Sequence, residues 1–87
     1  MNEITFDEAL LRAQNAIYEL AERNQLGELM IIDSAIVETE SAWYFPYDSS
    51  AFILRGDISA ALAGNLPVKV PRDGAMPSYE EPEEWRS

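Results

Sequence analysis

Carboxylates are almost the only side chains in this sequence that suggest chemistry. Six of them are candidates for a shared site: Asp33, Glu38, Glu40, Asp48, Asp57 and Asp73. Two neighbouring carboxylates can act as general acid and base, and several together can bind calcium. However, the sequence has neither the spacing of an EF-hand nor a glycine-rich phosphate loop. A carboxylate-based enzyme is therefore only a remote hypothesis.

The sequence contains no cysteine and no histidine. Disulfides, thiolate nucleophiles and most zinc sites are thereby excluded, and neither a Ser-His-Asp nor a Cys-His arrangement can be assembled. We therefore expect a protein that binds a partner and is not an enzyme, with no cofactor and no metal.

The candidate partner-binding residues fall into two groups. Tyr44 and Asp48 share one face of an aromatic strand, opposite the face that we assign to the core. The second group is C-terminal and surrounds one large aromatic ring: Tyr79, Glu80, Glu81, Glu83, Glu84 and Trp85. An aromatic anchor within an acidic rim can give an interface both a hot spot and electrostatic steering. The alternative is that Trp85 docks on its own domain, or that the segment is only a solvated tail.

The formal net charge of −10 bears on the class of partner. It disfavours contact with nucleic-acid phosphates and with anionic lipid. A protein with a basic surface is the natural counterpart of such a chain. The alternative is that the acidity only keeps a cytosolic protein soluble.

An amphipathic helix is predicted to begin at Thr5, which is placed as an N-cap with Glu8 three residues later. Its apolar stripe repeats at steps of four and three, through Phe6, Leu10, Ala13, Ile17 and Leu20. Further alanines widen the stripe, so this face should pack closely on a sheet. We expect the helix to end within residues 24–27, with Gly27 in the left-handed conformation.

The sheet is predicted from the stretches that follow. Residues 29–39 are rich in β-branched side chains, which favours a strand. Strict alternation would place Asp33 and Glu38 on opposite faces of that strand, and a bulge near Asp33 would resolve this conflict. A hairpin connection at residues 38–41 leads to the aromatic strand, in which Trp43, Phe45 and Tyr47 share the core face. Pro46 indicates an edge or a bulge. A turn at residues 48–50 then precedes a second short apolar run at residues 52–54.

A short helix and a final hairpin complete the expected fold. Asp57 is a good N-cap for residues 58–63, with Gly64 as the left-handed residue that follows. Asp73-Gly74 predicts a tight turn between a strand at residues 68–70 and a returning edge strand at residues 75–79. The fold class is α+β: an N-terminal amphipathic helix packed on a mostly antiparallel sheet of about four strands, with a short helix between the two hairpins.

Several pieces of the sequence resemble the immunity protein 35 family. They are Trp43-Tyr44-Phe45, Tyr47, Gly56-Asp57, Leu62-Ala63-Gly64-Asn65 and Pro67. The resemblance covers residues 5–74, and the proline-interrupted strand and acidic tail beyond them depart from the family pattern. It implies a small cytoplasmic bacterial protein, in many cases encoded beside a secreted toxin that it neutralises.

The expected function is therefore that of an immunity protein, which binds a cognate toxin and covers its active site or substrate groove. The expected partner is a toxin protein with a basic surface, and neither nucleic acid, membrane nor metal takes part. The alternative is a chaperone-like or peptide-binding module that uses an exposed sheet edge.

The predicted organisation is one α+β domain over residues 1–79, followed by an acidic segment at residues 80–87. The first residues lack the basic and apolar regions of a signal peptide, and no apolar run is long enough to span a bilayer. Both features predict a cytoplasmic protein.

Overall fold

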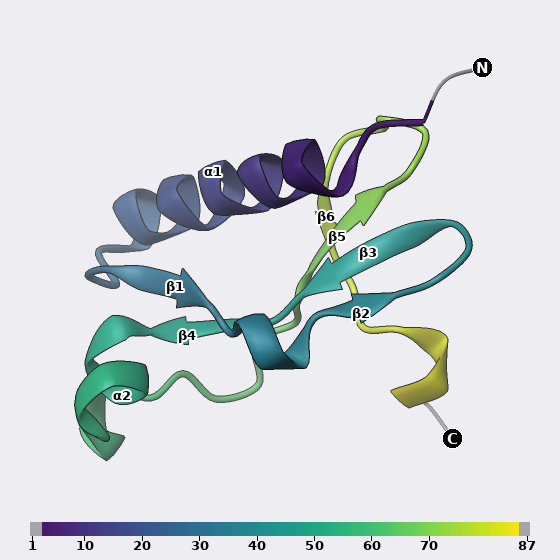
Figure 1. Cartoon of the computed structure of the whole chain (residues 1–87). Coiled ribbons are helices and arrows are strands. Elements are labelled where there is room, and N and C mark those ends of the chain that lie inside the picture. Colours follow the sequence, from purple (N-terminus) through teal and green to yellow (C-terminus); the bar gives the residue numbers. More distant parts are fainter. Residues whose placement is uncertain (1–2, 86–87) are drawn as a thin grey trace.

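The computed structural model describes residues 3–85, apart from the side chain of Glu84, and has one long helix lying over two antiparallel sheets (Figure 1). The predicted α+β class is confirmed, with its N-terminal helix and its second, short helix. Within the described residues, no helix is both long enough and apolar enough to cross a membrane.

The long helix α1 (Phe6–Asn24) begins as predicted at Thr5, whose Oγ1 accepts a hydrogen bond from the Glu8 amide at 3.1 Å. Its buried residues recur every four positions: Ala9, Ala13, Ile17 and Ala21. Phe6 stands at the margin of this stripe, and 40% of it is exposed. Gly27 has a φ of 74° and is left-handed as predicted, but the helix cap itself is Gln25, also left-handed, and the Ala21 carbonyl accepts the amides of both Gln25 and Leu26.

All strand pairs in the described chain are antiparallel. The larger sheet has the order β2-β3-β5-β6, formed by Val37–Glu38, Ala42–Phe45, Val68–Pro71 and Ser78–Tyr79. The smaller sheet pairs β1 (Leu29–Ile31) with β4 (Tyr47–Ser49). Pro46 separates β3 from β4, so the aromatic stretch supplies one strand to each sheet. As predicted, β6 is an edge strand, and the 3₁₀ turn η3 (Glu83–Trp85) follows it.

Three local predictions were wrong. Residues 29–39 do not form one bulged strand, because the 3₁₀ turn η1 (Asp33–Ala35) divides them between the two sheets. Residues 48–50 do not form a turn: they end β4 and begin α2 (Ser50–Arg55), which contains the second apolar run. The Ser49 hydroxyl caps this helix by accepting the Phe52 amide. The helix expected at residues 58–63 is only a 3₁₀ turn, η2 (Ile58–Ala60), although Asp57 does cap it.

The core lies where α1 packs against β1, β3 and β5. Trp43, Phe45 and Tyr47 all belong to it, as the strand pattern predicted. The other buried members of the cluster are Ala9, Ala13, Ile17, Ile31, Val68 and Val70. Small alanines on the helix face the large aromatic rings of the sheet, which lets the two layers approach closely.

Candidate functional site

The predicted partner-binding residues do not form one continuous site. Tyr44 is only 7% exposed and lies on an inner strand of the larger sheet, on the face turned away from α1. It lines a groove together with Lys69 and Glu83. Tyr44 and Glu83 are therefore two predicted residues that the fold does bring together.

Asp48 lies on the smaller sheet, where it holds the backbone. Its Oδ1 atom accepts hydrogen bonds from the amides of Ser49 at 2.7 Å and Leu62 at 2.8 Å. The Asn65 side chain adds a third bond by donating to the Tyr47 carbonyl at 3.1 Å. These bonds lie along the outer edge of β4 and give Asp48 a structural role, whereas its contact with a partner stays a prediction.

Tyr79 is joined to α1 and to the core. Its hydroxyl donates to the Ala16 carbonyl at 3.3 Å, and its ring meets that of Tyr47 edge-on, with centroids 6.4 Å apart. Burial raises the pKa of both tyrosines above the ordinary value of 10.0. For Tyr79, the charge of Arg23 opposes this rise in pKa and that of Glu19 adds to it.

The acidic segment is partly tied to the larger sheet. A Glu80 carboxylate oxygen lies 3.5 Å from the Lys69 Nζ atom, and Glu81 is half-buried. Trp85 is 48% exposed, so this ring is neither fully docked nor fully free. The side chain of Glu84 lies outside the described residues.

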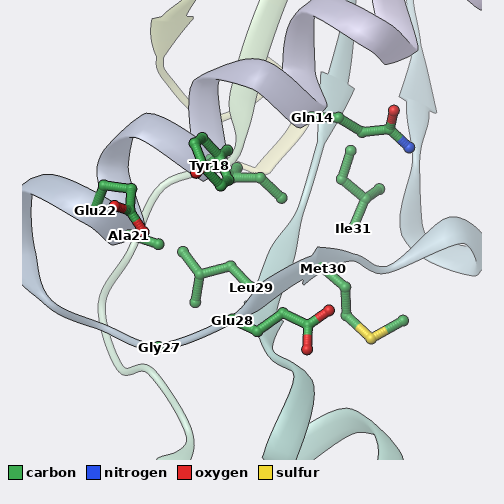
Figure 2. A pocket seen from close by; sticks show the side chains of 10 residues that line it. Gln14, Tyr18, Ala21, Glu22, Gly27, Glu28, Leu29, Met30 and Ile31 are labelled. Carbon is green, nitrogen blue, oxygen red and sulfur yellow. The ribbon is translucent and has the colours of Figure 1, made fainter.

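A different surface lies between α1 and β1, where the structure forms a groove of about 580 Å³. Figure 2 shows Leu29 and Ile31 pointing from the strand toward the helix, while Met30 lies on the other side of the strand. The helix contributes Tyr18 and the small Ala21 to the opposite wall. The groove is therefore largely apolar, with a strand along one side of it.

The outer edge of β1 is open. The Glu28 carbonyl and the Ile32 amide both bond toward the β4 side, and the register places Met30 between them. In an antiparallel pair, the residues between such bonded positions direct their N–H and C=O groups to the opposite side. Leu29 and Ile31 therefore present backbone donors and acceptors at the edge of the groove.

The carboxylates that line this groove, from Glu22 and Glu28, have no Lys or Arg among their lining neighbours. The helix cations Arg12 and Arg23 instead line a groove on the other flank of α1, beside Tyr79. Arg23 also lines a small hollow that it shares with Tyr18 and Glu22. The α1–β1 groove thus combines an apolar wall, a negative rim and an open strand edge. This combination suits an extended protein segment.

Comparison with known families finds that the family model described as Immunity protein 35 matches residues 7–87. The chain belongs to the immunity protein 35 family. The match includes the segment after Asp73-Gly74, which we expected to depart from the family pattern, and the β5–β6 pairing explains why this segment is part of the fold. No curated protein and no solved structure matches the chain. Membership supports an immunity role and implies a toxin as partner.

For this member of the immunity protein 35 family, the sequence prediction missed the α1–β1 groove. Tyr18 is 66% exposed, and Leu11 lies seven residues earlier, on the same side of the helix. Two exposed apolar residues outside the buried stripe were a visible signal of a second contact face on α1. The open edge of β1 gave no such signal, because it depends on which strand β1 pairs with.

The carboxylates first considered for chemistry do not gather into a metal site. In residues 3–85, no three acidic side chains are arranged so that they could hold a metal ion.

Proposed function

We propose that this protein binds a cognate toxin and neutralises it by covering the toxin's active site or substrate groove. The family match over residues 7–87 is the observation that carries this proposal. The protein acts by binding: its sequence has no cysteine and no histidine, so neither a Ser-His-Asp nor a Cys-His arrangement can be assembled.

The charge of the protein favours a toxin with a basic surface. The net charge of −10 includes exposed carboxylates on α1, before β1 and near the C-terminus, such as Glu22, Glu28 and Glu83. Acidic groups speed the encounter with a basic surface and repel nucleic-acid phosphates and anionic lipid. Exposed aromatic rings such as Tyr18 then supply anchoring contacts.

Coexpression tests the proposal. A toxin domain encoded in an adjacent reading frame is expressed alone, with the wild-type protein, and with Ala13→Asp, a core variant that we expect not to fold. Growth should stop in the first and third cultures and continue in the second, from which a complex of one toxin with one inhibitor should be purified. Growth arrest in the presence of soluble, folded wild-type protein would overturn the proposal.

Association kinetics test whether the negative charge of the protein speeds its binding to the toxin. The association rate constant should fall by about tenfold or more from low to high ionic strength, because salt screens the long-range attraction. The dissociation rate should change less. Stopped-flow measurements on the purified pair decide this, and an association rate indifferent to salt would leave the net charge of −10 as a solubility feature.

The open edge of β1 also favours a second candidate, a chaperone-like or general peptide-binding module. Weak binding to many unfolded chains, with no preference for the toxin, would support this alternative. A defined complex with one toxin supports the immunity function.

A further inference from the structure

The edges of the two sheets in the described chain differ in how readily they can pair with a further strand. The Asp48 carboxylate accepts the Ser49 amide and the Asn65 side chain donates to the Tyr47 carbonyl, and these bonds occupy the outer edge of β4. β2 and β6 are each only two residues long, and Pro77 directly precedes β6. β1 is three residues long, and both Leu29 and Ile31 direct backbone groups outward. Among these edges, β1 is best suited to receive a further strand.

We propose that an extended, basic segment of the toxin adds to the outer edge of β1 as a further strand. The inference rests on the proposed function and names the surface that performs it. The outward N–H and C=O groups of Leu29 and Ile31 pair with the incoming backbone, which gives affinity independent of sequence. Apolar side chains of the segment that face α1 enter the groove beside Tyr18, whose volume of about 580 Å³ has room for them.

The carboxylates beside the β1 edge favour an incoming segment that carries positive charge. Glu22 extends from the helix side of the groove, whereas Glu28 has the strand parity of Met30 and lies on the other face (Figure 2). A Lys or Arg on either face of the incoming strand therefore meets a carboxylate. Arg12 lies on the opposite flank of α1, and Arg23 does not line the α1–β1 groove, although it shares a neighbouring hollow with Tyr18 and Glu22.

A second copy of this chain is a poorer occupant of the same edge. Two β1 edges placed side by side would bring both pairs of Glu22 and Glu28 to one junction, between molecules that each carry a net charge of −10. Like charges facing each other across an interface are unfavourable. The acidic rim thus disfavours self-pairing and favours a foreign, basic strand.

A synthetic peptide tests the edge without the toxin. We expect a short peptide of alternating Lys and Val to bind, and the matched peptide of alternating Glu and Val not to bind. Amide hydrogen exchange then reports on three consecutive residues. Exchange at Leu29 and Ile31 should slow by about tenfold or more on binding, whereas Met30, already paired with β4, should change little.

Matched variants test the groove. Tyr18→Ala removes part of the apolar wall and Glu22→Lys reverses the charge of the rim. Their controls are Leu54→Ala, which truncates an equally exposed residue on α2, and Glu19→Lys, which makes the same charge change on α1 at a residue that does not line the α1–β1 groove. We expect the two groove variants to weaken binding of both the Lys-Val peptide and the toxin by about tenfold or more, and the controls by less than about twofold.

The outcomes separate this inference from the proposed function. Unchanged exchange at Leu29 and Ile31 in the toxin complex, or equal weakening by Glu19→Lys and Glu22→Lys, overturns strand addition. If the groove variants still bind and neutralise the toxin at full affinity, the immunity function stands and strand addition alone fails. If the peptide protects the edge but no toxin is neutralised, the immunity function fails and the toxin is not the occupant.

Discussion

Asp48 ties two backbone amides, those of Ser49 and Leu62, through one oxygen atom. We expect Asp48→Ala to lower the free energy of unfolding by about 1–3 kcal/mol, because two partly buried amides lose their acceptor. Asp73→Ala is the control, since Asp73 is exposed and accepts only the nearby Ala75 amide, and it should cost less than about 1 kcal/mol. Urea unfolding measures both values, and an equal loss in the two variants would contradict the role of Asp48.

The paired rings of Tyr47 and Tyr79 make stability sensitive to alkaline pH. Burial raises the pKa of both groups in the folded state, so the unfolded chain loses these protons at lower pH. The stabilisation is therefore complete below about pH 10 and is lost as the pH rises through the folded pKa. Tyr79→Phe keeps the ring and removes the ionisable hydroxyl, so urea unfolding across this pH range should show a smaller loss for the variant. Equal losses would assign the effect to other groups.

Among the elements, α1 was the most predictable from sequence. Its cap at Thr5 and its buried face follow from local chemistry and a period of about four residues, both of which the sequence carries directly. The strands were less predictable because pairing is a long-range property. Residues 29–39 are rich in β-branched side chains, but alternation along a single strand would place their acids on opposite faces. In the structure η1 divides these residues between two sheets, so no single strand has to place both acids. At residues 50–55, the hydroxyl cap of Ser49 overrides an apolar pattern that also suits a strand.

The close packing of α1 on the sheets gives a prediction at this scale. Ala13 is completely buried among core residues, so Ala13→Asp places an unpaired carboxylate in the core and should cost several kcal/mol, comparable to the whole stability of a small domain, about 5–15 kcal/mol. Gln14→Asp is the matched control, because Gln14 is exposed one residue further along. Thermal melts followed by circular dichroism should show no cooperative transition for the first variant and a near-normal one for the second.

At the scale of the whole molecule, the sequence predicted the fold class and the family better than it predicted where a partner binds. The residues that carry the resemblance are core aromatics, caps and turn formers such as Trp43, Asp57 and Gly64, and these determine the fold. The α1–β1 groove, in contrast, arises only when helix and strand are placed side by side. Glu22 and Glu28 are unremarkable acids in the sequence, and they become the rim of one groove because the chain turns back after α1.

The C-terminal turn η3 contains Glu83 and Trp85, two of the partner-binding residues predicted from the sequence, and it lies outside the α1–β1 groove. Deleting residues 83–87 leaves β6 intact, including the hydrogen bond from the Glu80 amide to the Pro67 carbonyl at 3.1 Å. We therefore expect the melting temperature to stay near that of the full chain. Because half-exposed Trp85 is our proposed aromatic anchor, toxin affinity should weaken by about thirtyfold, the ~2 kcal/mol of one hot-spot residue.

Combining this deletion with Glu22→Lys shows whether the two surfaces act separately. Contacts that share no partner residues contribute additively, so the free-energy losses of the deletion and of the substitution should sum to within about 0.5 kcal/mol. Calorimetric titration of the toxin with all three variants measures this sum. Unchanged affinity after the deletion would remove η3 from the interface, and a lowered melting temperature would instead show that Trp85 supports its own domain.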